Sequence, residues 1–157
     1  MIRKAQMQDA ENIAGLALQM WNEHDLHDLV NAFRELIDSE ESACFIKCVD
    51  EKPVAFAQVQ LRHDYVEGTD SSPVGYLEGI FVSAQYRRNG YATELLSECE
   101  NWAKEKGCSE FASDCEVGNM DSLRVHYRPC RSLRKQLTRT LKLLPPRRPR
   151  TNRDCPS

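Results

Sequence analysis

Apolar residues recur near the start of this chain at the three- and four-residue spacing of amphipathic helices. The first such stretch follows Asp9, whose carboxylate can cap a helix, and the second runs from Leu26 to Ile37. A third helix is expected to begin at Thr93 and to stop near Gly107, and residues 121–127 can start a fourth. The sequence thus predicts four helices, and the stretches between them have a different periodicity.

Those intervening stretches carry short apolar runs bounded by Gly, Pro, Asp and Ser, which indicates β-strands. Five strands are expected: Ile2–Ala5, Ala43–Val49, Val54–Tyr65, Tyr76–Val82 and Cys108–Asp114. Together with the helices they predict the element order β-α-α-β-β-β-α-β-α. A chain of 157 residues with this order fits one folded body around a single core.

A loop, Arg87-Arg88-Asn89-Gly90-Tyr91-Ala92, joins the run Tyr76–Val82 to the third helix. A helix N-terminus offers unpaired N–H groups and the positive end of the helix dipole. Gly90 and the small Ala92 allow a ligand to approach the backbone, and the two arginines add positive charge. The loop therefore predicts a phosphate or pyrophosphate site, although it matches neither a P-loop nor a Rossmann fingerprint. An ordinary strand-to-helix turn is the alternative interpretation.

This loop resembles the R/Q-x-x-G-x-G/A loop of the GCN5-related N-acetyltransferases, which holds the pyrophosphate of acetyl-CoA. The predicted order of elements is also that of this family. The resemblance implies acetyl-CoA as co-substrate. It also implies an α/β (α+β) fold in which helices flank a mixed, mostly antiparallel sheet. No metal is expected, because the Cys and His residues show no ligand spacing.

Further segments resemble one branch of that superfamily, the aminoglycoside 6′-N-acetyltransferases. These segments are Tyr65–Thr69, Ser72–Val74, Leu77–Val82 and Glu110–Asp114. The resemblance covers about residues 1–126 and implies an antibiotic-resistance enzyme that acetylates the 6′-amine of an aminoglycoside. The alternatives are an acetyltransferase for a polyamine or a protein amine, and an impaired fold that acts as a binding module.

The resemblance implies that the aminoglycoside contacts Trp21, Tyr65, Glu78 and Asp114, with Glu78 as the catalytic residue. An amine must lose a proton before it attacks a thioester, and carboxylates can attract the ammonium group and pass its proton to water. Each residue also has a structural interpretation. Trp21 can be a core aromatic, Tyr65 a cross-strand aromatic, Glu78 a solvent-facing strand residue, and Asp114 a turn residue.

On the coenzyme side, the resemblance implies that the backbone of Ile80, Phe81 and Val82 pairs with the pantetheine arm like an added strand. One of these N–H groups would polarise the thioester carbonyl. Asn119 matches the family position whose amide contacts the coenzyme, although a turn-forming Asn explains it as well. The residues expected around the pyrophosphate are Arg88, Asn89, Gly90, Tyr91, Ala92 and Thr93.

Charge divides the chain sharply. Residues 1–126 carry 11 Lys and Arg against 23 Asp and Glu, a net charge of −12, whereas residues 127–157 carry +9. The acidic body favours a cationic substrate and disfavours nucleic acid. The N-terminal residues lack the apolar stretch of a signal peptide, and no run is long enough to span a membrane, so a cytoplasmic location is expected.

The sequence leaves the family pattern after Tyr127, which predicts an acetyltransferase domain over residues 1–127 and an atypical basic tail over 128–157. We interpret the tail as a divergent, frame-shifted or otherwise replaced C-terminus. The usual last strand is expected to be missing, and an open sheet edge invites pairing into a homodimer. His126 and Tyr127 are equal candidates for the acid that protonates the leaving thiolate. Leu133, Leu137, Leu141 and Leu144 are spaced for at most a short helix, with disorder from Pro145.

Overall fold

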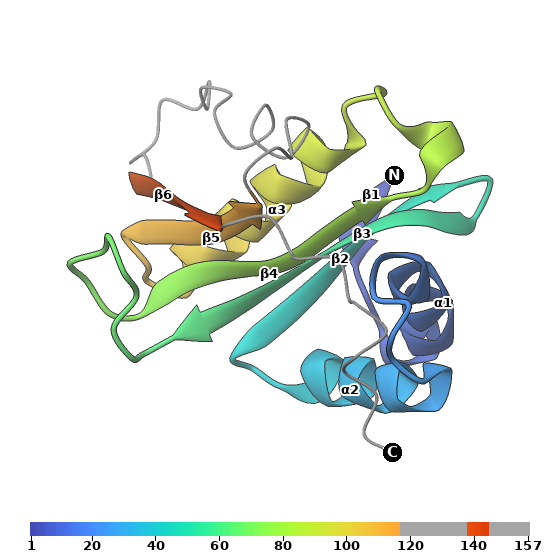
Figure 1. Cartoon of the computed structure of the whole chain (residues 1–157), viewed down its shortest axis with the longest axis horizontal. Helices are drawn as coiled ribbons and strands as arrows, with labels where there is room; N and C mark the ends of the chain where they lie inside the picture. Colours follow the sequence, from blue (N-terminus) through green and yellow to red (C-terminus); the bar gives the residue numbers. More distant parts are fainter. Residues whose placement is uncertain (117–137, 145–157) are drawn as a thin grey trace, which may run out of the picture.

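The computed structural model describes residues 1–116 and 138–144. Its strands are β1 (Ile2–Lys4), β2 (Ser42–Val49), β3 (Lys52–Arg62), β4 (Val74–Val82), β5 (Glu110–Glu116) and β6 (Thr138–Leu144). Its helices are α1 (Ala10–Met20), α2 (Leu26–Asp38) and α3 (Tyr91–Glu105), with short 3-10 turns at Met7–Asp9 and Ala84–Tyr86. All five strands and the first three helices predicted from the sequence are present, with ends that differ by a few residues (Figure 1).

The strands form one six-stranded sheet in the order β1-β2-β3-β4-β5-β6. The pairs from β1 to β4 are antiparallel, whereas β4 with β5 and β5 with β6 are parallel. A parallel pair needs a crossover, and α3 supplies it between β4 and β5. The mixed, mostly antiparallel sheet predicted above is confirmed.

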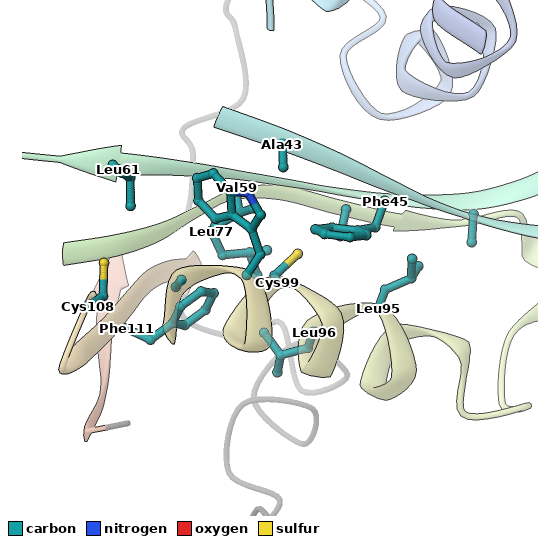
Figure 2. Close-up of a cluster of buried hydrophobic side chains, with 14 residues drawn as sticks. Ala43, Phe45, Val59, Leu61, Leu77, Leu95, Leu96, Cys99, Cys108 and Phe111 are labelled. Atoms are coloured by element: carbon teal, nitrogen blue, oxygen red, sulfur yellow. The ribbon is translucent and has the colours of Figure 1, made fainter. Parts of the chain in front are cut away.

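Helices cover both faces of this sheet, with α1 and α2 on one face and α3 on the other (Figure 1). Figure 2 shows the core on the α3 face, where Leu95, Leu96 and Cys99 of the helix meet Phe45, Val59 and other side chains of the strands. The second core, on the α1 and α2 face, centres on Ile13, Phe33, Ile46 and Phe56. These two clusters of buried apolar side chains pack the helices onto the two faces of the sheet.

Gly75 of β4 explains how closely α3 approaches the sheet. A Cβ built at this glycine would lie 2.6 Å from Cβ of Ala103 and 2.9 Å from the ring of Phe111. No side chain fits into that space, so glycine at 75 and alanine at 103 set the separation of α3 from β4. The N-terminus of α3, and the loop before it, are thereby fixed relative to the sheet.

The cap predicted at Asp9 is corrected by the structure. Asp9 occupies the position before α1, but its side chain makes no hydrogen bond to the N-terminus of that helix. Its carboxylate instead accepts two hydrogen bonds from Arg3, at 2.7 and 2.8 Å, and one from the backbone N–H of Gln6. The Arg3 guanidinium binds both carboxylate oxygens, and this two-point pair adds geometric specificity, so the carboxylate is directed to Arg3 and away from the helix start.

The expectation that the sheet lacks a C-terminal strand is wrong. Residues 138–144 form β6, which pairs with β5 from Glu110–Thr138 to Glu116–Leu144. The leucine spacing that suggested a helix through Leu141 and Leu144 is overruled by this pairing. The free edge of β5 offers a row of N–H and C=O groups, and a segment rich in Thr and Leu satisfies them as a strand.

Several expectations fall outside the described residues. They are the helix over residues 121–127, the leucines at 133 and 137, and the disorder from Pro145 onward. The division into residues 1–127 and 128–157 stays a prediction. Among the described helices, none has the length and apolar character needed to cross a membrane.

Candidate active site

A β-bulge in β4 marks the centre of the candidate site. Gln58 of β3 pairs with Gly79 and Val59 pairs with Leu77, so Glu78 is the extra residue between two consecutive pairs. A bulge bends its strand and redirects the side chain that it carries. Glu78, the predicted catalytic residue, therefore lies at an interruption of the ladder rather than in a regular strand.

The bulge coincides with the point where β4 and β5 part. These two strands pair only from Gly75–Phe111 to Leu77–Ser113. Beyond it, within the described residues, the edge of β4 that faces β5 has no strand partner, while β5 continues to pair with β6. Ile80, Phe81 and Val82 lie on this open part of β4. Their unpaired backbone edge can accept an extended ligand as an added strand.

Arg62 holds the carboxylate of Glu78. Its Nε and Nη2 donate hydrogen bonds of 3.1 and 2.8 Å to the same oxygen, Oε1. The guanidinium also stacks on Tyr76, with its carbon 3.5 Å from the centre of the ring. The Glu78 side chain is 24% exposed and that of Arg62 is 40% exposed. The alternative interpretation of Glu78, a strand residue that simply faces solvent, is therefore wrong.

Trp21 lies against Gly79 of β4, the residue that follows Glu78. It follows α1 directly, is half-buried, and its ring meets Phe56 edge-on with centroids 6.4 Å apart. A Cβ at Gly79 would lie 3.0 Å from two carbons of the Trp21 ring. Trp21 thus packs on the second core and also touches the residue that follows Glu78, so the two interpretations of this residue do not exclude each other.

Tyr65 lies on the loop between β3 and β4 and is 82% exposed. The strand predicted to reach Tyr65 ends at Arg62, so the cross-strand interpretation of this tyrosine is wrong. The same loop is anchored at its far end, where Glu110 accepts hydrogen bonds from the Ser71 hydroxyl and from the Asp70 N–H at 2.9 Å. These bonds favour the carboxylate and lower the pKa of Glu110.

Asp114 lies inside β5, where its backbone pairs with Lys142 of β6. Because β5 continues to Glu116, the alternative of Asp114 as a turn residue is wrong. In register, Asp114 comes one residue after Ser113, the last partner of β4, so it follows the same divergence at which Glu78 lies. Asn119, His126 and Tyr127 lie outside the described residues.

The loop before α3 has the backbone of an anion cradle. Gly90 caps the helix with φ of 80° and ψ of 7°, and Arg88 also has a positive φ, 65°. No side chain caps the N-terminus of α3, whose first turn includes Tyr91, Ala92 and Thr93. Nothing lies within 4 Å of the place that a Cβ on Gly90 would occupy. The space beside Gly90 and the uncapped helix start together leave room for an anion.

Several side chains hold this loop and the start of α3 in place. Nε of Arg87 donates to the carbonyl of Val82 at 3.0 Å, and the Asn89 amide donates to the carbonyl of Tyr86 at 2.9 Å. Lys47 of β2 lies under the first turn of α3, with Nζ 2.7 Å from a carboxylate oxygen of Glu94 and 4.5 Å from the centre of the Tyr91 ring. Asn89 and Arg87 therefore shape the loop, and Lys47 ties the helix start to the sheet.

Three of the described cysteines carry thiols of low reactivity. Cys44 and Cys99 are fully buried, and burial raises the pKa of both thiols well above the ordinary value. Partial burial likewise raises the pKa of Cys108. A thiol held in its neutral form is a poor nucleophile, so none of these three cysteines is suited to nucleophilic catalysis.

Among the described residues, one cluster has side chains that can bind a metal, and it consists of Asp25, His27 and Asp28, whose potential ligand atoms lie within 4.8 Å of one another. All three residues are exposed. The Asp25 carboxylate already accepts hydrogen bonds from the backbone N–H groups of His27 and Asp28 as the cap of α2. Capping explains the grouping without a metal.

Sequence reasoning missed Arg62 and Lys47. Pairing β3 with β4 as a hairpin would not have found Arg62, because its cross-strand partner is Val74 and Glu78 lies four residues further along β4. The long Arg62 side chain spans this offset, and the bulge at Glu78 shifts the register by one further residue. No pattern along β2 distinguishes Lys47 from any solvated lysine.

Comparison with known proteins places this geometry in a family. The acetyltransferase (GNAT) family matches residues 7–130. The aminoglycoside N(6′)-acetyltransferase type 1 of Serratia marcescens is 43% identical over 122 residues, which are 75% of this chain and 84% of the relative. The enzyme of the same name from Stenotrophomonas maltophilia is 40% identical over 126 residues, covering 80% and 81%.

Solved structures agree with the sequence relatives. The aminoglycoside acetyltransferase AAC(6′)-Iy, in complex with the bisubstrate analogue CoA-S-monomethyl-acetylneamine, superposes with a TM-score of 0.77 at 38% identity, covering 80% of this chain and 86% of that one. The aminoglycoside 6′-N-acetyltransferase AAC(6′)-Ih from Acinetobacter baumannii gives a TM-score of 0.73 at 35% identity, covering 80% and 86%. The chain with the bulge at Glu78 and the glycine-capped loop at Gly90 belongs to the acetyltransferase (GNAT) family.

Proposed function

We propose that this chain transfers the acetyl group of acetyl-CoA to the 6′-amine of aminoglycoside antibiotics. Curated relatives that are 38–43% identical over most of the chain carry this activity in their names. A bisubstrate analogue that joins CoA to an aminoglycoside is bound by a protein of the same fold. The net charge of −12 over residues 1–126 suits a polycationic substrate.

The observation that carries the proposal is the open edge of β4 between the bulge at Glu78 and the loop at Gly90. Ile80, Phe81 and Val82 would hold the pantetheine arm by backbone hydrogen bonds, and one of their N–H groups would polarise the thioester carbonyl. At the far end of the edge, the uncapped start of α3 would receive the pyrophosphate. The residues proposed there are Arg88, Asn89, Gly90, Tyr91, Ala92 and Thr93.

On the substrate side, we propose that Glu78 attracts the 6′-ammonium group and receives or relays its proton. Trp21, beside the bulge, would support a sugar ring and contact an ammonium through its π face. Exposed Tyr65 would reach sugar hydroxyls from the β3–β4 loop, and Asp114 would add a second carboxylate beyond the divergence of β4 and β5. Asn119 is proposed as a further contact to the coenzyme.

The reaction needs no covalent enzyme intermediate. The amine nitrogen, once deprotonated, attacks the thioester carbonyl carbon, so that a C–N bond forms and the C–S bond breaks. The amine proton leaves through the carboxylate to water, and the CoA thiolate takes up one proton from an acid that we assign to His126 or Tyr127. Holding both substrates in one complex supplies the effective concentration that makes direct attack fast.

A pair of antibiotics that differ at one atom tests the proposal. Neomycin carries a 6′-amine and paromomycin a 6′-hydroxyl in otherwise the same framework. We expect acetyl-CoA consumption with neomycin, kanamycin and tobramycin, and at least a hundredfold slower consumption with paromomycin. Mass spectrometry should find one added acetyl group on the 6′-nitrogen. Equal rates with paromomycin would contradict the assigned position, and turnover of spermine alone would establish the polyamine alternative.

We also propose that the chain is a cytoplasmic homodimer. Acetyl-CoA is an intracellular metabolite, which supports the location. The edge of β6 that faces away from β5 is one of the two outer edges of the described sheet. An unpaired strand edge is a surface on which two chains can pair. Sedimentation of the purified protein should give twice the chain mass of 18.0 kDa.

A further inference from the structure

The ion pair between Arg62 and Glu78 is arranged in a way that stability alone does not explain. Both side chains are partly exposed, and exposed ion pairs contribute only about 0–1 kcal/mol to folding. Yet the guanidinium is restrained twice, by two hydrogen bonds to Oε1 of Glu78 and by stacking on Tyr76. Because this restrained arginine binds the proposed catalytic carboxylate, we consider whether it serves the reaction.

Tyr76, on which the Arg62 guanidinium stacks, is itself held in place by buried neighbours. Tyr76 is 6% exposed and packs with Val66, Val74 and Ala112 in a small apolar cluster of its own. Its ring therefore cannot move away from the guanidinium without breaking that cluster. The chain of contacts runs from this cluster through Tyr76 to Arg62 and ends on one oxygen of Glu78.

The two oxygens of Glu78 differ in their described hydrogen bonds. Oε1 accepts both hydrogen bonds from Arg62, while among residues 1–113, whose side chains the structure describes, no hydrogen bond reaches Oε2. A bulge residue has no regular ladder to fix its side chain, so the carboxylate would otherwise rotate among several rotamers. Arg62 fixes one rotamer and leaves the second oxygen available to a ligand.

We propose that Arg62 is a positioning residue of the acetyl transfer, which orients Glu78 so that Oε2 meets the substrate amine. This inference rests on the proposed function. In this role Arg62 would act only through the Glu78 carboxylate, which its two described hydrogen bonds reach. Arginine is required rather than lysine, because a planar guanidinium can stack on Tyr76 and donate two N–H groups together.

A double-mutant cycle on the full chain tests the inference. R62M keeps the apolar length of the side chain and removes the charge and the donors, and we expect it to lower kcat/KM for neomycin about 10- to 100-fold, mainly through kcat. R62K should recover only part of this loss. In the E78Q background, R62M should change kcat/KM less than twofold, because the group through which Arg62 acts is already gone.

The control variant is R34M, which removes the arginine of the exposed 3.5 Å pair between Arg34 and Glu11 and should leave the kinetics unchanged. Equal losses from R62M in the wild-type and E78Q backgrounds would overturn the inference. A lowered KM for neomycin in R62M would also overturn it, since Arg62 would then be a competitor of the cationic substrate.

Failure of the proposed function shows separately, in the wild-type chain. If the wild type acetylates spermine but no aminoglycoside, the substrate assignment is wrong, and the same cycle run with spermine still decides the role of Arg62. If the wild type acetylates neomycin and the cycle is additive, only the Arg62 inference fails. Thermal unfolding of R62M should match that of R34M within a few degrees, which separates positioning from a role in folding.

Discussion

The indole ring of Trp21 lies against the backbone of Gly79, the residue after the bulge. A Cβ at position 79 would lie 3.0 Å from Cη2 and from Cζ2 of the ring, closer than side chains normally pack. The missing side chain thus lets an aromatic residue from the end of α1 reach β4 beside Glu78. This contact joins the helical layer to the proposed reaction centre.

Gly79→Ala should displace the Trp21 ring. Because the neighbouring atoms are part of a rigid ring system, we expect the free energy of unfolding to fall by about 1–3 kcal/mol. KM for neomycin should rise severalfold if Trp21 supports a sugar ring. Tryptophan fluorescence and steady-state kinetics measure both effects. Gly15→Ala is the matched control, since nothing lies within 4 Å of its Cβ position on α1, and it should stabilise the helix. An unchanged KM and stability in Gly79→Ala would contradict the contact.

Gly90→Val should weaken coenzyme binding. The new side chain would fill the open space at the start of α3, and we expect acetyl-CoA affinity to fall more than tenfold, about 1.4 kcal/mol or more. Valine at a positive φ also strains the backbone. Gly107→Val controls for that strain, because Gly107 has a similar φ of 90° and also faces open space, but lies beyond the other end of α3. Calorimetry should find the affinity loss in Gly90→Val alone.

Glu78→Gln should lower kcat/KM for kanamycin by about 10²-fold, because the amide keeps the shape of the side chain but can neither attract the ammonium group nor accept its proton. Acetyl-CoA affinity should change little. Glu11→Gln, at an exposed carboxylate of α1, is the control that keeps normal kinetics. Turnover of Glu78→Gln close to that of the wild type would remove Glu78 from the mechanism.

The strands and helices were predictable wherever one local signal dominated. The helical period of α2 and the glycine that ends α3 located those elements, and the run from Tyr76 to Val82 marked most of β4. The loop at Gly90 was predictable because a strand, a glycine and a helix start follow one another directly. In each case the information lies within about ten neighbouring residues.

Features that depend on partners distant in the sequence were missed or misread. Leu141 and Leu144 fit a helix as well as a strand, and only the free edge of β5 selects the strand. Asp9 looked like a helix cap because Arg3 was not known to reach it. The hydrogen bond from Arg62 to Glu78 forms at a bulge that shifts the register of β3 and β4, and no short sequence pattern predicts a bulge.

Asp9 predicts a pH dependence of stability. Its hydrogen bonds from Arg3 lower the pKa of the buried carboxyl below the ordinary value. The group therefore stabilises the fold fully above its unfolded pKa, near 3.9, and loses that contribution as the pH falls through the lower, folded pKa. Asp9→Asn should cost about 1–3 kcal/mol at pH 7 and progressively less below pH 4.

Urea unfolding of wild type and Asp9→Asn between pH 7 and pH 3 measures this difference. Asp50→Asn is the control, because Asp50 is an exposed turn residue with positive φ, a conformation that Asn tolerates. A difference between wild type and Asp9→Asn that stays constant down to pH 3 would show that the Arg3–Asp9 pair is not the source of the lost stability.

The strand β6 predicts which part of the C-terminal region matters to folding. It pairs with β5 along all seven residues from Glu110 to Glu116, so its loss would leave the backbone groups on that side of β5 without partners. A chain shortened to residues 1–137 should therefore melt several degrees below one shortened to residues 1–144, as a loss of about 1–2 kcal/mol would cause in a domain of this size. Both chains lack the residues after Leu144, so the comparison isolates the strand. If the two shortened chains melt at the same temperature, β6 adds nothing to the stability of the sheet.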